Sequence, residues 1–428
     1  MRCLSASCAL TVVLLAMAWA DAHHHIGHDH HGHPPGHDHD DHQHYKDHHG
    51  HEVHPCHILA PPNGKFAFDL YKNLLGKSPA GSNIFFSPLG VATALSMLST
   101  GAHGATHSQM FTTLGYNEFN QTQINEAYQH LLKLLGEPNE YQLEFGNGIA
   151  LRNDFSTLET FVNDVKTYYQ GEFFHVDFSK PTDAAAKINS FIANKTHDMI
   201  KDQVKDLDNA MAMVLISYIY FSGQWEKPFN ASFTHKDTFH VSSSKTVQVD
   251  MMKRTGRYKY YNDKEHHHQA ILLPYKGGNS SMIVVLPDEG KMDEVEGILD
   301  LGHFRHWLKK LKQRLHSVTL ELPKFSISDE ASLKETLQEL GIKDAFEDNA
   351  DFSGISDKVP TKVSKATHKA VMSVDEVGTT AAAATTLEMM PMSMPIHMVV
   401  NRPFLVFIME KASKSILFMG KVSDPTAA

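Results

Sequence analysis

The chain has 428 residues, of which 42% are hydrophobic and 21% are charged, and its formal net charge is −10. This acidic excess argues against a general nucleic-acid binder or an anionic-membrane binder, so proteins or metals are the expected partners. The length alone would allow two or three domains, but no Gly/Pro/Ser-rich linker interrupts the chain after residue 60. We therefore expect one folded domain.

The first twenty residues are typical of a secretory signal peptide, which we assign to residues 1–20. Arg2 precedes the apolar run 9–18, and Ala18-Trp19-Ala20 matches an Ala-x-Ala cleavage motif. The run is too short to span a bilayer, so we expect a secreted, extracellular protein that does not bind membranes. Four glycosylation sequons agree with this route. They begin at Asn120, Asn194, Asn230 and Asn279.

Residues 21–57 form a low-complexity tail that holds sixteen of the chain's 31 histidines. Its composition cannot bury enough apolar surface to offset the entropy of ordering, so we expect it to be disordered. Signal cleavage after Ala20 or after Ala22 would in both cases place a histidine third, in Asp21-Ala22-His23 or in His23-His24-His25. A free amine, two backbone amides and an imidazole suit square-planar Cu(II) or Ni(II).

The other tail histidines offer weaker zinc sites together with nearby aspartates. They include His28, His30, His31, His33, His37 and His39. The alternative is a solubilising arm whose charge rises as its histidines protonate. No cofactor is required under either interpretation.

Cys56 is the single cysteine that remains once the signal is removed, so no disulfide can form within the mature chain. It lies between His54 and His57, where a protonated or metal-bound imidazole would favour the thiolate. A free thiol on a disordered tail, able to pair with small thiols, is the alternative.

Hydrophobic periodicity after the tail predicts helices first and strands later, which is typical of an α+β fold built around large mixed sheets. Apolar residues recur at helical spacing in the ranges 62–76, 88–101, 121–136, 157–169, 184–199 and 293–313. Strand-like apolar runs occupy 211–221, 270–273, 282–286, 318–325, 362–374, 401–410 and 415–422.

The segment 375–395 is the most informative part of the chain. It joins an uncharged run of Thr and Ala to a methionine-rich stretch that ends at Pro395. Its alternation would let a strand present Thr379, Ala381 and Ala383 to one face, although composition alone also fits a flexible linker.

An enzymatic function finds no support in the motifs of the chain. Gly-x-Ser-x-Gly, His-Glu-x-x-His and phosphate-binding glycine loops are missing from the sequence. Ser87 and His368 could suggest a nucleophile and a base, but Ser87 precedes Pro88 as a helix cap and His368 lies in a strand pattern. We therefore expect a non-enzyme in which these two residues belong to a buried hydrogen-bond cluster.

Five motifs, taken in order and spacing, resemble the serpins over roughly residues 60–425. The motifs are Asn83–Leu89, Gly223–Phe229, His368–Val371, Asn401–Glu410 and Ser415–Val422. The resemblance implies one α+β serpin domain over residues 58–428, with about three β-sheets, eight to nine helices and an exposed reactive-centre loop at about 377–396.

The resemblance also implies roles for particular residues. The hinge of the loop would be Gly378, Thr379, Thr380, Ala381, Ala382, Ala383 and Ala384. The bond attacked by a protease would join Met392 to Ser393. The buried cluster called the shutter would hold Ser87, Ser217 and His368, where Ser217 replaces an asparagine common in relatives and so predicts a looser network. The breach would hold Trp225 and a Lys324–Glu376 ion pair.

The apolar Met392 would fit the hydrophobic primary pocket of an elastase-like or chymotrypsin-like serine protease. We therefore expect a secreted, monomeric inhibitor of such proteases that does not bind nucleic acid. The alternative is a non-inhibitory carrier or metal-binding glycoprotein that keeps the fold as a scaffold.

Overall fold

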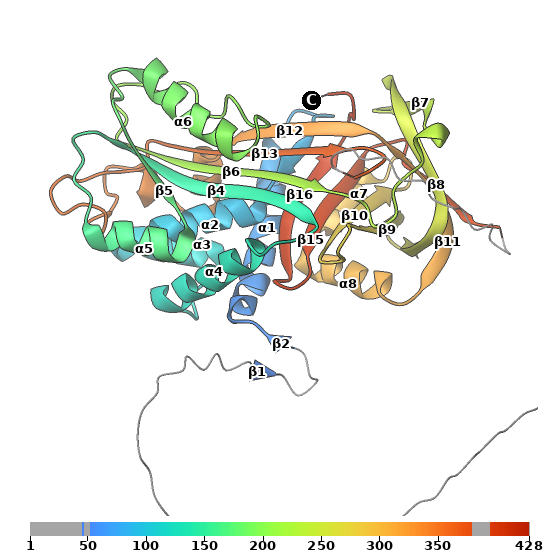
Figure 1. Cartoon of the computed structure of the whole chain (residues 1–428), viewed down its shortest axis with the longest axis horizontal. Helices are drawn as coiled ribbons and strands as arrows, with labels where there is room; N and C mark the ends of the chain where they lie inside the picture. Colours follow the sequence, from blue (N-terminus) through green and yellow to red (C-terminus); the bar gives the residue numbers. More distant parts are fainter. Residues whose placement is uncertain (1–44, 47–51, 379–393, 428) are drawn as a thin grey trace, which may run out of the picture. The chain divides into compact units, whose positions relative to one another are not determined.

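The computed structural model describes residues 45–46, 52–378 and 394–427, and it divides the chain into the units Met1–His44 and Tyr45–Ala428. The second unit contains all the secondary structure discussed below (Figure 1). The signal peptide and the tail histidines from His23 to His39 lie outside the described residues. Two short strands, β1 (Tyr45–Lys46) and β2 (Glu52–Val53), form a separate two-stranded sheet.

A five-stranded sheet in the order β12-β13-β6-β4-β5 forms one of the two main layers (Figure 1). Its strands are β4 (Tyr141–Arg152), β5 (Glu172–Val176), β6 (Met213–Gly223), β12 (Phe325–Ser332) and β13 (Lys365–Val374). All eleven residues of β6 are buried, because helices cover both faces of the sheet. β13 runs parallel to β6 and antiparallel to β12.

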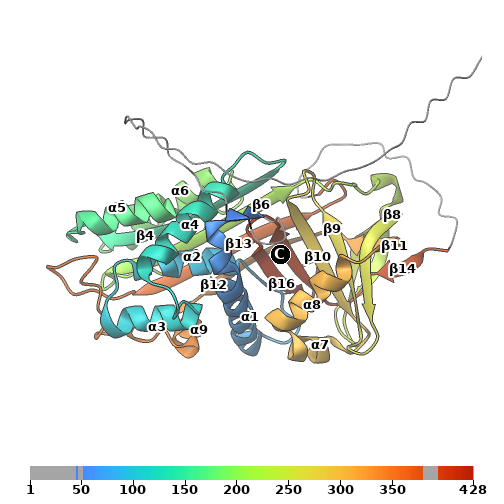
Figure 2. The ribbon, with the colours of Figure 1, turned by 90° about the horizontal axis from the view of Figure 1, so that it is seen from below.

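The second large sheet has nine strands in the order β14-β11-β8-β9-β10-β15-β16-β3, with β7 also paired to β8. Its strands are β3 (Ile84–Phe86), β7 (His235–His240), β8 (Thr246–Asp263), β9 (His268–Pro274), β10 (Ser280–Pro287), β11 (Leu315–Pro323), β14 (Ile396–Val399), β15 (Phe404–Glu410) and β16 (Ser415–Val422). Figure 2 shows this sheet with α7 and α8 on one side of the molecule and the helices α3 to α6 on the other.

Nine α-helices occur in the described part of the chain. They are α1 (Ala60–Lys77), α2 (Pro88–Ser99), α3 (Gly104–Leu114), α4 (Gln121–Leu135), α5 (Glu159–Tyr169), α6 (Pro181–Lys195), α7 (Met292–Ile298), α8 (Leu301–Leu311) and α9 (Lys334–Leu340). Local sequence explains several starts: Ser87 caps α2 before Pro88, and Asn120 with Gln123 forms a capping box for α4. Three 3₁₀ turns, η1 (Pro55–Leu59), η2 (Ala231–Phe233) and η3 (Asp344–Phe346), complete the list.

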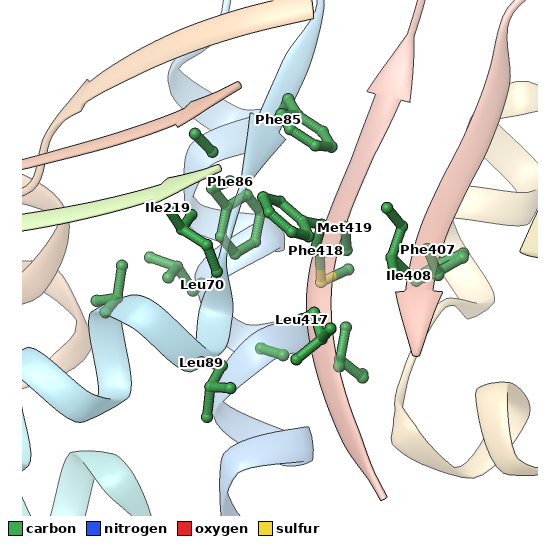
Figure 3. Close-up of a cluster of buried hydrophobic side chains, with 14 of the residues drawn as sticks. Leu70, Phe85, Phe86, Leu89, Ile219, Phe407, Ile408, Leu417, Phe418 and Met419 are labelled. Carbon is green, nitrogen blue, oxygen red and sulfur yellow. The ribbon is translucent and has the colours of Figure 1, made fainter. Parts of the chain in front are cut away.

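The core joins the two large sheets around β3 and β16. Figure 3 shows Phe85 and Phe86 of β3 next to Phe418 of β16, with Leu89 and Ile219 on the same side and Phe407 beyond β16. The rings of Phe85 and Phe418 stack with centroids 5.3 Å apart, which adds a specific contact to the burial of large apolar surface. This core anchors β6 and α2, the elements that carry the shutter residues.

The expected fold class, sheet number and helix number are confirmed, but several boundaries differ. The stretch 293–313 is two helices, because the extended backbone of Leu299 ends the first and Asp300 caps α8 by accepting a hydrogen bond from His303 N. The stretch 318–325 is two strands separated at Lys324. The long strands β4 and β8 were missed, since their burial does not alternate regularly along the strand.

Cys56 differs from both expectations, because η1 packs against α4 and buries it to 1% exposure. This burial raises the pKa of its thiol to about 12, so the group is protonated at neutral pH. Residues 55–57 therefore belong to the folded body and not to the tail. Among the described residues, no helix is long and apolar enough to cross a membrane.

Candidate functional site

The breach lies where β13 ends and the chain turns toward the loop. Lys324 Nζ lies 2.9 Å from Glu376 Oε2, so the structure brings together the two residues of the expected ion pair. The hydroxyl of Thr234 donates to Glu376 Oε1 at 2.8 Å. Burial alone would raise the pKa of Glu376, but the hydrogen bonds from Lys324 and Thr234 outweigh it and hold the pKa below its usual value. Glu376 is therefore an ionised anchor.

Trp225 stabilises the same turn through two hydrogen bonds. Its indole Nε1 donates to the carbonyl of Asp375 at 2.9 Å, and its backbone N donates to the carbonyl of Val377 at 2.8 Å. The indole is 3% exposed and stacks on Tyr275 with centroids 4.6 Å apart and an interplanar angle of 12°. This stacked pair covers the turn and holds its carbonyls in place.

Gly378 is the first residue of the expected hinge, and the described part of the chain before the loop ends with it. The Asp375 carboxylate accepts hydrogen bonds from the backbone N of Val377 and of Gly378, which closes a tight turn. Gly378 has φ 140°, and a Cβ there would lie 2.1 Å from the carbonyl oxygen of Gly223. Only glycine fits this turn, because both the backbone angle and the close approach exclude a side chain. Hinge residues Thr379 to Ala384, together with Met392 and Ser393, lie outside the described part of the chain.

The ladder between β13 and β6 stops before either strand ends. Its register runs from Lys365–Val214 to Val371–Tyr220, whereas β13 continues to Val374 and β6 to Gly223. Over these last three residues β13 keeps its pairing with β12, but no ladder pair to β6 occurs among the described residues. The two strands are therefore not paired with each other over their last three residues, before the isolated bridge between Gln224 and Gly378.

The shutter lies beneath the paired part of the same two strands. His368 Nε2 accepts a hydrogen bond from Ser87 N at 2.9 Å, so its Nδ1 carries the proton and donates to Ser217 Oγ at 3.1 Å. His368 is fully buried, which lowers its pKa to about 3 and keeps the ring neutral. Ser87 Oγ accepts from Gly90 N as the cap of α2. The cluster joins a helix to two strands and does not form a nucleophile–base pair.

Ser217 leaves neighbouring polar groups less well satisfied. Asn147 lies opposite Ser217 in the β4–β6 register, and its Oδ1 is buried without a hydrogen-bond partner among the described residues. The side chain of Gln203 donates to the Ser217 carbonyl at 2.7 Å, but its Oε1 is also unpaired there. Sequence reasoning missed both residues, because no pattern in the chain links positions 147 and 203 to 217.

The sequons occupy different surroundings. Asn120, Asn194 and Asn279 are exposed, whereas Asn230 is half-buried and caps η2 by accepting from Ser232 N. Thr196, in the second sequon, is fully buried, where its hydroxyl donates to the carbonyl of Ile192.

The ladder between β13 and β6 ends three residues before either strand does, directly beside the Asp375–Gly378 turn. The family model described as "Serpin (serine protease inhibitor)" matches residues 61–425. The chain belongs to the serpin family.

Relatives and solved structures also support the assignment to the serpin family. The chain is 48% identical over 356 residues to "Alpha-1-antitrypsin homolog" of Cyprinus carpio, covering 83% of this chain and 95% of that protein. It is 43% identical over 364 residues to "Alpha-1-antiproteinase S" of Cavia porcellus, covering 84% and 89%. Human thyroxine-binding globulin, crystallised with thyroxine, is similar at a TM-score of 0.83 and 36% identity, covering 87% and 100%. The names of the two relatives agree with the likeness to alpha-1-antitrypsin that Pro391-Met392-Ser393 indicates in the sequence.

Proposed function

We propose that the protein inhibits elastase-like or chymotrypsin-like serine proteases by inserting its cleaved reactive loop into the five-stranded sheet. The observation that carries this proposal is the unpaired end of β13 and β6 directly beside the Asp375–Gly378 turn. Because β13 and β6 are parallel, a chain that reverses after β13 runs antiparallel to both. The single parallel pairing of β13 with β6 is then replaced by two antiparallel pairings. Antiparallel strands are slightly more stable per residue than parallel ones.

The chemistry needs no catalytic group of this chain. The serine of the protease attacks the carbonyl of Met392, the bond to the Ser393 nitrogen breaks, and the protease remains joined to Met392 as an ester. Inserting about fourteen residues at about 3.3 Å each moves that ester by roughly 45 Å. The small side chains of Thr379, Ala381 and Ala383 can enter a closed sheet at little cost, whereas a buried unpaired charge there would cost several kcal/mol.

The first test is the complex with elastase. We expect a complex that survives boiling in detergent, and the released C-terminal peptide should begin at Ser393 by mass spectrometry. Met392→Arg should redirect inhibition to trypsin-like proteases, because their primary pocket requires a cation. A peptide that begins elsewhere would refute the assigned bond.

The second test separates inhibition from simple cleavage. Thr379→Arg should be cut at the same bond but should release an active protease, because the buried arginine stops insertion. Cleavage of the parent protein should raise its thermal midpoint sharply. An unchanged midpoint would favour the carrier function described next.

A carrier function is the second candidate, and one observation favours it. A hollow of about 1000 Å³ lies against α8 and the second large sheet, with Leu272, Phe304 and Met409 in its wall and Arg305 and Lys312 among its charged residues. Such a lining suits an apolar ligand that carries a negative charge. Thyroxine, the ligand in the similar globulin structure, is a first probe, and the absence of saturable binding would remove this candidate.

We also propose secretion, with the signal peptide cut after Ala20 or Ala22, and one tight copper site at the new N-terminus. The added zinc sites of the tail would be loose and separable from inhibition. A version that lacks residues 21–50 leaves η1 intact and should lose the copper site while keeping inhibition. Equal copper affinity in the two versions would contradict the site.

A further inference from the structure

We propose that His235, Asp237 and Glu321 form a zinc site that links the segments on either side of the reactive loop. One ligand atom from each of these residues lies within 4.8 Å of the others. An imidazole nitrogen with two carboxylate oxygens is a ligand set that Zn²⁺ accepts, with the fourth position left to water. The site shares no residue with the breach, the shutter or the tail.

Strand register explains why the three side chains meet. His235 and Asp237 of β7 lie opposite Met251 and Val249 of β8, and Glu321 of β11 lies opposite Lys253. Positions 249, 251 and 253 alternate along β8, so the three ligands project from one face of the sheet. The sequence separates His235 from Glu321 by more than eighty residues, and only the sheet brings them together.

Each ligand is already oriented by a second partner. The Nδ1 of His235 faces the carbonyl of Phe233 at 3.2 Å, which leaves Nε2 directed to Glu321 Oε2 at 3.7 Å. Histidine ligands of metals usually donate their other ring N–H to such a group. Lys253 Nζ holds Glu321 Oε1 at 2.9 Å, so Oε2 remains for the metal. Asp237 Oδ1 accepts a hydrogen bond from Thr238 N at 2.7 Å.

The three ligand atoms need to move only slightly closer together to bind the ion. Ligand atoms around tetrahedral zinc are about 3.4 Å apart for bonds of about 2.1 Å. His235 is exposed and Asp237 is half-buried, so both side chains can rotate, while Glu321 has a side chain only 11% exposed and sets the position of the site. Zinc would also relieve the repulsion between the two carboxylates.

The position of the site gives it a consequence for the loop. His235 follows Thr234, whose hydroxyl holds Glu376 before the loop. The carbonyl of Glu321 accepts a hydrogen bond from Val400 N, directly after the strand to which the loop returns. Bound zinc therefore links the segments before and after the loop. It should raise the midpoint of thermal unfolding. If the proposed inhibition holds, zinc should also slow loop insertion.

The test is diethyl pyrocarbonate footprinting of the full chain, with the modified peptides read by mass spectrometry. Because the readout is local to each histidine, zinc bound by the tail does not obscure it. We expect zinc to protect His235 while His240, exposed at the far end of β7, stays reactive as the internal control. Equal modification of His235 with and without zinc, at concentrations that protect the tail histidines, would overturn the proposal.

Glu321→Gln provides the matched variant, since it keeps a hydrogen-bond acceptor for Lys253 but loses the charge. Even an outer partner of a metal ligand is worth about 10–100-fold in affinity, so losing a direct ligand should raise the zinc concentration for half-protection by more than about 100-fold. Protection of His235 that is unchanged in this variant would also refute the site. This footprint does not depend on protease inhibition, so a failed inhibition assay leaves it interpretable.

Discussion

Acid should destabilise the protein through His368 of the shutter. Its pKa is about 3 in the folded state, because the ring is fully buried, whereas an unfolded histidine titrates near 6.5. A depressed folded pKa means that the stabilisation is complete above about pH 6.5 and is lost as the pH falls toward 3. Each pH unit below 6.5 should then cost roughly 1.4 kcal/mol in the free energy of unfolding.

Between pH 7.5 and pH 5.0 the loss from His368 alone should be about 2 kcal/mol. The perturbation that isolates it is His368→Gln, which removes the titration but keeps a donor and an acceptor. The variant will be less stable at every pH, because the bonds to Ser87 and Ser217 change, so the informative quantity is the difference in slope. Half-buried His130 and buried His268 have lowered pKa values too, because burial disfavours the charged ring, but they contribute equally to both proteins.

Urea-induced unfolding at the two pH values, followed by tryptophan fluorescence, measures this difference. His240→Gln is the matched control, because an exposed histidine is solvated in both states. We expect the control to lose the same stability as the parent and His368→Gln to lose about 2 kcal/mol less. If all three proteins lose the same amount, the assignment of a buried, neutral His368 is refuted.

Three further predictions concern the turn, the ion pair and the thiol. Gly378→Ala should lower stability by at least about 1–2 kcal/mol, because the backbone angle disfavours a side chain and the carbonyl of Gly223 blocks a Cβ; an unchanged urea midpoint would contradict this. Lys324→Ala should cost about 1 kcal/mol, since Lys324 is partly exposed but Glu376 loses its charged partner; the same unfolding assay would show no loss if the pair were merely a surface contact. Cys56 should react with a colorimetric thiol reagent at pH 8 only after unfolding, because its thiol is buried and its pKa is about 12; rapid reaction of the native protein would be inconsistent with burial.

Short-range chemistry was readable from the sequence. Pro88 after Ser87 indicates a capped helix because the cap involves residues only three positions apart. The apolar runs that became β15 and β16 are continuous, so they can be recognised without knowing their neighbours. The resemblance to the serpins implied the pair of Lys324 with Glu376, and the structure places their charged atoms in contact.

Features that depend on distant parts of the chain needed the tertiary structure. The burial of Cys56 follows from the packing of η1 on α4, and nothing in its histidine-rich surroundings indicates this. The early end of the β13–β6 ladder and the meeting of His235 with Glu321 are set by strand register. Periodicity records which face of an element is apolar, but it does not record which strand lies beside it. The sequence by itself therefore determined the family and the capped helices. The folded sheets decided where the β13–β6 ladder ends and which side chains of distant strands meet, because both depend on contacts between segments far apart in the chain.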